Sequence, residues 1–142
     1  MGFWDSILGK EETSLPSGKT LANPFAISLS FHPLRLSANA ANSINLIVKI
    51  KNISSDVQLA SVDALLPKNV MIGFDKPGIN KATEQRLGEI KPGETTTVSL
   101  PIWANNQTKD GKYEIDVTVF SHYIGYNKVL SYIKKKTSFR IV

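Results

Sequence analysis

Apolar and polar residues alternate with a period of two through most of this chain. Between residues 25 and 31, apolar side chains stand at every second position, namely Phe25, Ile27, Leu29 and Phe31. Alternation of this kind is typical of a β-strand that buries one face. The same pattern predicts further strands over residues 44–51, 57–66, 70–74, 95–102, 113–119 and 129–142, and a short one near residues 85–87.

Turn signals separate these strands at short intervals. Polar, proline-containing or glycine-containing stretches lie at residues 52–56, 75–78, 91–94 and 105–111. No helical pattern occurs after residue 12. The sequence therefore predicts an all-β fold, an antiparallel immunoglobulin-like Greek-key β-sandwich of about seven or eight strands, preceded by a short amphipathic helix.

A tyrosine stands where the turn leads into the penultimate predicted strand. Its sequence is Asp110-Gly111-Lys112-Tyr113. In a tyrosine corner, the phenol bonds back to the backbone and fixes a Greek-key crossover. We therefore predict a structural corner formed by Asp110, Gly111 and Tyr113.

Several of these features together resemble bacterial and archaeal immunoglobulin-like modules of the CARDB and NPCBM-associated types. The matching features are Asn52 after an alternating strand, Leu66-Pro67, the run Gly88-Glu89-Ile90-Lys91-Pro92-Gly93-Glu94, and Gly111-Lys112-Tyr113. The resemblance covers residues 25–142. It implies a domain that is not an enzyme and that binds, spaces or assembles other components.

The first twelve residues differ from the alternating body of the chain. On a helix, Phe3, Trp4, Ile7 and Leu8 fall within an arc of roughly 140°, and Gly9 is a suitable C-terminal cap. Two helical turns are not stable alone in water, so this attachment segment needs a surface to dock on. Three surfaces stay open: the chain's own domain, a membrane, and a groove on a partner protein.

A linker is predicted between this segment and the sandwich. Residues 13–24 contain Pro16, Gly18 and Pro24, which interrupt both helix and strand. The predicted organisation is therefore an attachment segment at residues 1–12, a linker at residues 13–24 and a β-sandwich domain at residues 25–142.

The composition excludes several kinds of chemistry. The chain has no cysteine and only two histidines, which excludes disulfides, thiolate metal sites and cysteine nucleophiles. His32 and His122 are predicted to be exposed residues at strand ends, and no G-x-S-x-G motif accompanies them. We expect no catalytic residue, metal, cofactor or small-molecule substrate, and a protein that is not an enzyme.

The formal net charge is +5, and basic residues gather on the last predicted strand. One interpretation is an edge strand that lysines protect from pairing with other sheets. The other is a contact with an anionic surface. A nucleic-acid partner is not expected, because neither an aromatic platform nor a groove-reading helix is present. The residues concerned are Lys128, Lys134, Lys135, Lys136 and Arg140.

These observations predict a non-enzymatic protein-interaction or assembly module, attached through its N-terminal segment to a protein partner or to other copies of itself. Two alternatives stay open. One is a peripheral membrane protein that uses residues 3–8 and the basic residues, and the other is a structural subunit of a filament, coat or virion. No secretory signal is recognisable, so we expect a cytoplasmic location or the inner face of the membrane.

Overall fold

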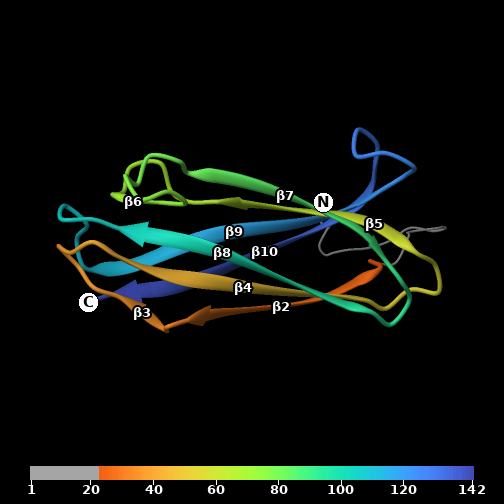
Figure 1. Cartoon of the computed structure of the whole chain (residues 1–142), viewed down its shortest axis with the longest axis horizontal. Helices are drawn as coiled ribbons and strands as arrows, with labels where there is room; N and C mark the ends of the chain where they lie inside the picture. The colour runs from red at the N-terminus through yellow and green to blue at the C-terminus, as the bar shows by residue number, and fades with distance from the viewer. Residues whose placement is uncertain (1–22) are drawn as a thin grey trace.

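The computed structural model describes residues 23–142, and every regular element in that range is a β-strand (Figure 1). The attachment segment and most of the predicted linker lie outside the described residues. The strands are β2 (Phe25–His32), β3 (Arg35–Leu36), β4 (Asn42–Asn52), β5 (Gln58–Leu65), β6 (Ile72–Gly73), β7 (Ala82–Ile90), β8 (Thr95–Ala104), β9 (Gly111–His122) and β10 (Val129–Ile141).

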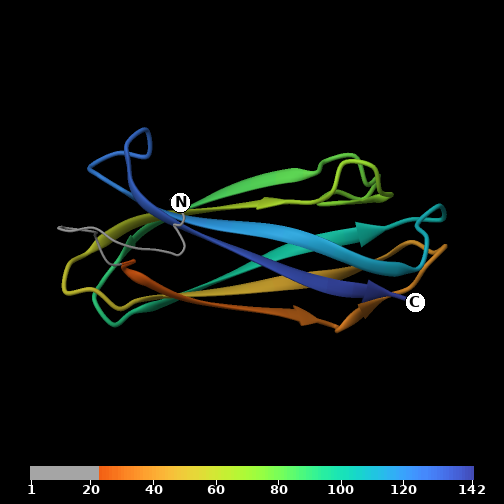
Figure 2. The same cartoon turned by 180° about the vertical axis from the view of Figure 1, so that it is seen from behind.

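The strands form two sheets packed face to face (Figures 1 and 2). One sheet has five strands in the order β3-β10-β9-β5-β7, and the other has four in the order β2-β4-β8-β6. All pairs are antiparallel except β3 with β10. The all-β sandwich predicted from alternation is therefore confirmed.

The core lies between the sheets and comes from the alternating positions of the long strands. In β4, every second residue from Ile44 to Ile50 is fully buried, and in β9 the same holds from Ile115 to Val119. Val62 and Ala64, which alternate along β5, are also buried. Alternation thus identified the faces of the central strands correctly.

The start of the domain contributes to both sheets. β2 pairs along its whole length with β4, and the chain then crosses over at the cis peptide His32-Pro33. The short β3 lies parallel to the end of β10, with Arg35 opposite Arg140 and Leu36 opposite Ile141. This exchange between sheets supports the immunoglobulin-like assignment.

Two strands differ from the sequence prediction. β7 spans residues 82–90, whereas only a short strand near residues 85–87 was predicted. It is an edge strand with most side chains exposed, so burial imposes little alternation on its sequence. β6 has two residues within the predicted strand 70–74, because the rest of that segment belongs to an irregular connection.

In that connection, residues 66–81, one lysine binds several backbone carbonyl groups. The Lys81 Nζ donates to the carbonyl oxygens of Val70 at 2.6 Å and Gly78 at 2.8 Å, and also to that of Ile72. Burial lowers the pKa of the Lys81 ammonium, while the Asp75 carboxylate raises it. The ammonium therefore supplies hydrogen-bond donors to carbonyl groups, most of which have no partner strand.

The sandwich has two different ends. At one end, β2 begins and the connection between β9 and β10, residues 123–128, rises away from the four-stranded sheet, as both views show (Figures 1 and 2). We call this the hairpin end. At the opposite end lie the C-terminus, β3 and β6, and we call it the C-terminal end.

Candidate functional site

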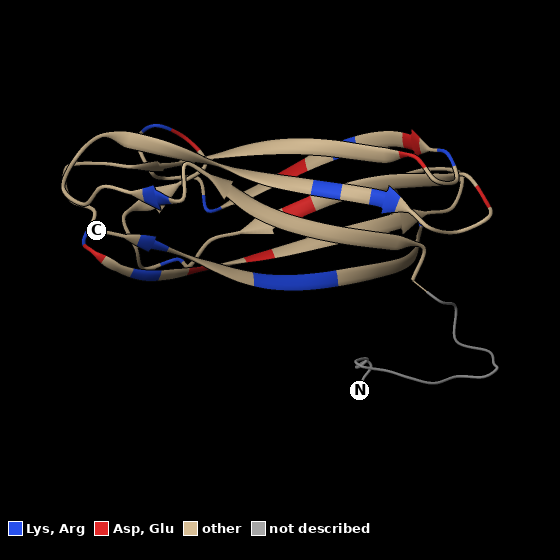
Figure 3. Cartoon of the chain, turned by 90° about the horizontal axis from the view of Figure 1, so that it is seen from below, with Lys and Arg blue, Asp and Glu red and all other residues tan. Residues whose placement is uncertain are grey.

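The basic residues of the last strand do not form a single patch. Lys134, Lys136 and Arg140 lie on the outer face of β10, since the alternate residues Phe139 and Ile141 are buried. Figure 3 shows this strand with a broad blue band at its middle and a second blue segment at its arrowhead.

Two of these lysines already have partners. The Lys136 ammonium lies 3.7 Å from a Glu114 carboxylate oxygen and 3.8 Å from one of Asp116. These are exposed ion pairs, which contribute little to stability. The Lys135 ammonium instead reaches the other sheet and donates to the Ile27 carbonyl oxygen of β2 at 3.0 Å.

The position of β10 explains why lysines occur there. Among residues 23–142, the only strand on its outer side is β3, which pairs with Arg140 and Ile141. The stretch from Val129 to Phe139 therefore presents an unpaired edge within the described structure. Lysines on an exposed edge oppose the addition of another strand, so these contacts favour edge protection over an anionic contact for Lys135 and Lys136.

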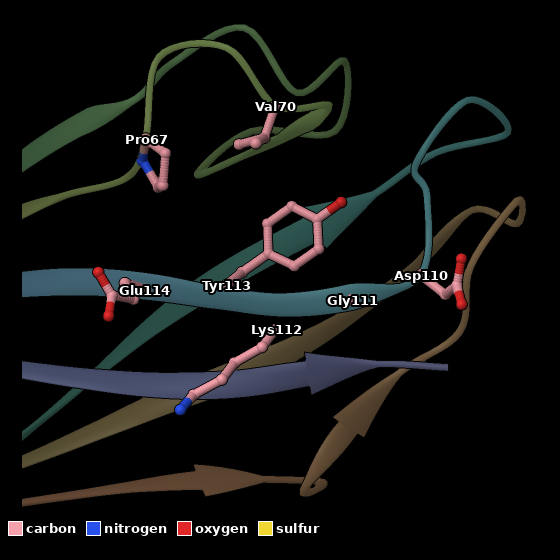
Figure 4. A pocket seen from close by; sticks show the side chains of 7 residues that line it. All are labelled: Pro67, Val70, Asp110, Gly111, Lys112, Tyr113 and Glu114. Carbon is pink, nitrogen blue, oxygen red and sulfur yellow. The ribbon is translucent and has the colours of Figure 1, made fainter.

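A shallow cleft of about 450 Å³ lies at the C-terminal end (Figure 4). The Tyr113 ring faces Pro67 and Val70 across it, whereas Lys112 points to the other side of the strand. The Tyr113 hydroxyl donates to the Lys109 carbonyl oxygen at 2.7 Å, which is the contact that a tyrosine corner makes. Burial, and secondly the Asp110 charge, raise the pKa of Tyr113.

This cleft carries little chemistry. Its ionisable side chains are those of Asp110, Lys112, Tyr113 and Glu114, and the Tyr113 hydroxyl is already used by the backbone. Within the described part of the chain, no group of three histidine or acidic side chains could hold a metal ion. The cleft therefore fits a structural role better than a binding one.

His122, predicted to be exposed, is in fact buried, with 7% of its surface accessible. Its Nε2 lies 2.7 Å from the hydroxyl of Ser61, and its Nδ1 lies 3.2 Å from the Lys128 carbonyl oxygen. Since a carbonyl only accepts, Nδ1 carries the proton, and in the neutral ring Nε2 accepts from Ser61. The prediction failed because a loop covers this position, whereas His32 is exposed as predicted.

The covering loop is residues 123–128. Tyr126 packs its ring edge-on against His122, with centroids 5.1 Å apart, and the Arg86 guanidinium lies 4.7 Å from the Tyr126 centroid. The Tyr126 hydroxyl accepts a hydrogen bond from the Gly88 N–H at 2.9 Å. The loop is thereby fixed to β7 and β9.

Its tip has a strained backbone. Gly125 N–H donates to the Tyr123 carbonyl oxygen at 2.6 Å, and Ile124 between them has φ of 66°. A hydrogen bond between residues two apart, with a positive φ at the residue between them, is characteristic of the rare and strained γ-turn. A β-branched residue such as isoleucine is an outlier at positive φ. Packing of Ile124 does not compensate for this strain, because 84% of the residue is exposed.

Ile124 stands at the tip of an exposed apolar surface. Each of its members exposes half or more of its surface, and all come from the tip of the loop or the first four residues of β10. We call this surface the hairpin patch. It consists of Tyr123, Ile124, Val129, Leu130 and Tyr132.

Sequence reasoning missed the hairpin patch. The strands predicted over residues 113–119 and 129–142 leave Tyr123 and Ile124 in the turn between them. They place Val129, Leu130 and Tyr132 at the start of the second strand, with no special role. The available signal was the sequence Tyr123-Ile124-Gly125-Tyr126, because large apolar residues in a short turn are unusual. The residues predicted for attachment, Phe3, Trp4, Ile7 and Leu8, lie outside the described residues.

No family model matches the chain, and no curated protein matches it. Solved structures with a similar fold include native α-2-macroglobulin from Escherichia coli, with a TM-score of 0.54 and 19% identity over 85% of this chain and 7% of that one. A FixG-related protein from Vibrio parahaemolyticus has a TM-score of 0.52 and 14% identity, covering 84% of this chain and 98% of that one.

A third similar structure is the Pseudomonas fluorescens alkylpurine DNA glycosylase AlkC bound to DNA, with a TM-score of 0.51 and 14% identity. The match covers 83% of this chain but 30% of the glycosylase. Our chain thus spans less than a third of the glycosylase and less than a tenth of the macroglobulin. At these identities the likeness shows the sandwich fold alone, and it does not distinguish the CARDB and NPCBM-associated types from other immunoglobulin-like domains.

Proposed function

We propose that this protein is a non-enzymatic protein-interaction or assembly module that makes contact at its hairpin end. The observation that carries the proposal is Ile124, a large apolar side chain exposed at the tip of a strained turn. Backbone strain persists where the surrounding structure enforces it, and it gathers at functional positions. Here His122 and Tyr126, with Arg86 against the Tyr126 ring, hold the loop on either side of Ile124.

The rest of the hairpin patch supports a contact of this kind. Contiguous exposed apolar residues beside a polar surround are typical of interaction sites. Burying one such side chain completely is worth roughly 1.5–3 kcal/mol. A partner that covers Ile124, Leu130 and Tyr132 would therefore gain appreciable affinity.

Burial of the His122–Ser61 pair supports the non-enzymatic part of the proposal. Among the described residues, the one histidine bonded to a hydroxyl is His122, and its partner Ser61 exposes only 1% of its surface. A nucleophile must reach its substrate, and here Tyr126 covers the pair.

The described chain enters β2 at this same end (Figure 1). Residues 3–8, which the sequence predicts as an attachment point, lie outside the described residues. Among residues 23–142, no helix is long and apolar enough to cross a membrane.

The test uses one substitution in the patch and a matched one outside it. Ile124→Gly removes the apolar tip and relieves the strained φ, so we expect the free energy of unfolding to change by less than about 1 kcal/mol, since relief of strain offsets the extra freedom of glycine in the unfolded chain. The control is Ile79→Gly at the C-terminal end, where 73% of the side chain is exposed.

Both variants and the wild type are used as bait in a pull-down from cells that express the protein. A partner retained by wild type and by Ile79→Gly, but bound about ten-fold more weakly by Ile124→Gly, supports the proposal. Equal retention by all three would refute it. Sedimentation with phosphatidylserine vesicles runs in parallel, and loss of vesicle binding in Ile124→Gly with no loss of protein partners would favour the peripheral membrane alternative instead.

A further inference from the structure

We propose that the hairpin patch is the docking site of the N-terminal segment of the same chain. The segment is residues 3–8, with the apolar side chains Phe3, Trp4, Ile7 and Leu8. Its position, its reach and its charge each favour this intramolecular contact.

The direction in which the chain enters the sandwich favours it first. Lys135 of β10 touches Ile27 of β2, and Ile141 pairs with Leu36 further along the chain. The two strands therefore run in the same direction along this side of the sandwich. Going backwards from Ile27 through Phe25 therefore leads to the hairpin end of the sandwich, where β10 also begins.

The linker is long enough for the contact. On β10, the patch begins three residues from Lys135 at Tyr132 and reaches Val129 six residues away, or about 10 to 20 Å along a strand. Tyr123 and Ile124 lie beyond this, at the tip of the loop. Residues 9–24 separate the segment from β2, and a flexible chain of that length has an end-to-end distance of about 22 Å. The segment can therefore reach the β10 part of the patch without stretching the linker.

The charges are complementary. The first twelve residues contain Asp5, Glu11 and Glu12 against the single Lys10. The hairpin patch is flanked by the exposed lysines 128 and 134, and neither has an ion pair within residues 23–142. An apolar segment with acidic flanks suits this surface better than it suits an anionic membrane, which would repel the carboxylates.

An intramolecular contact also has a concentration advantage. A short flexible linker gives an effective concentration in the millimolar range, so at micromolar protein the chain's own segment outcompetes that of a second copy. This contact does not depend on the proposed function.

The absence of cysteine makes a direct test simple. Ser6→Cys in the full chain provides a single thiol for a nitroxide spin label, placed off the apolar arc of the segment. We expect the label to broaden the backbone amide signals of residues 123–132 in the NMR spectrum of the ¹⁵N-labelled protein. The amides of the C-terminal end, such as those of residues 105–111, should keep their intensity, and uniform or absent broadening would overturn the proposal.

A mixed sample identifies the source of the contact. Spin-labelled chains without ¹⁵N are added to ¹⁵N-labelled chains without the spin label, and no broadening at residues 123–132 is expected. Broadening in the mixed sample would assign the contact to a second copy and overturn the intramolecular one. Broadening that requires phosphatidylserine vesicles would overturn it in favour of a membrane contact.

Substitutions in the N-terminal segment and in the hairpin patch complete the experiment. Phe3→Ser with Trp4→Ser, and separately Ile124→Gly, should restore the amide intensities of residues 123–132, whereas Ile79→Gly should not. Broadening that persists in all variants would refute the contact. If the broadening is absent but Ile124→Gly still loses its partner in the pull-down, the intramolecular contact is refuted and the proposed function stands. If the broadening is present but Ile124→Gly keeps its partner, the proposed function alone is refuted.

Discussion

Residues 66–81 and residues 123–128 both connect strands of the sandwich, yet they differ in what holds their backbone. In the longer connection, polar side chains bind the backbone: Lys81 holds three carbonyl groups, and the Asp75 carboxylate accepts from the backbone N–H groups of Ile79 and Asn80 at 2.9 and 3.0 Å. The shorter one directs Ile124 outwards on a strained turn.

The difference separates stability from function. Irregular backbone needs partners for its polar groups, and the longer connection obtains them within the described chain. The hairpin also has an anchor in His122, Tyr126 and Arg86, but this anchor fixes a surface that is poorly suited to water. A well-anchored turn that exposes a large apolar side chain at a strained, positive φ is better explained by a contact than by folding.

The largest effect should come from the lysine of the longer connection. Lys81→Met is expected to lower the free energy of unfolding by about 2–3 kcal/mol, because hydrogen bonds from a charged donor are lost and their acceptors are left unpaired. Chemical denaturation measures the change, with the exposed Lys68→Met in the same connection as the control. Equal denaturation midpoints for the two variants would show that Lys81 does not stabilise the longer connection.

A smaller loss is expected beneath the hairpin. Ser61→Ala removes the donor to His122 Nε2 and should cost about 1–2 kcal/mol, because a buried ring nitrogen loses its partner. Amide hydrogen exchange should then be faster in residues 123–128. Ser99→Ala on β8, where the side chain is exposed, should change neither quantity; if Ser61→Ala behaves in the same way, His122 does not anchor the hairpin.

The hydroxyl of Tyr113 tests whether the C-terminal end depends on single polar contacts. Tyr113→Phe should cost about 1 kcal/mol through loss of the hydrogen bond to Lys109. The wild-type protein should also lose stability above pH 10, because the raised pKa of Tyr113 means that the unfolded chain ionises first. That loss should be smaller in the variant, and an unchanged denaturant midpoint would argue against a tyrosine corner.

The smallest effect is expected for Asp63, on the strand that carries Ser61. One carboxylate oxygen of Asp63 is buried without a partner, and burial, with the Glu84 charge, raises its pKa above 3.8. The unfolded chain therefore ionises first, and stability falls as pH rises through the range above 3.8. Asp63→Asn should add about 0.5 kcal/mol at pH 7 and less at pH 3, whereas Asp56→Asn in an exposed turn should add nothing at either pH.

The sequence predicted most of the fold because its long strands bury one face. β4 and β9 each alternate over their whole central part, and their inward residues are the core. β7 was underestimated because an edge strand with Glu84, Gln85 and Arg86 exposed carries no such pattern. Periodicity therefore reports burial, and it detects a strand only where burial is present.

The site was harder to predict because it depends on contacts between distant residues. Nothing near His122 in the sequence shows that Tyr126 covers it or that Ser61 bonds to it. Likewise, the three carbonyl groups held by Lys81 come from residues up to eleven positions away. Lys135 belonged to a run of three lysines, and only the pairing of the sheets shows that it points to β2.

The crossing of the chain between the sheets has a mechanical consequence. β2 begins at the hairpin end and β10 finishes at the C-terminal end, beside the parallel strand β3. A pulling force between these two ends would act along the strands, so it would load the ladders of β2 with β4 and of β10 with β9 in shear. Because bonds loaded in shear must break together, we expect the domain to transmit tension along its long axis without unfolding strand by strand.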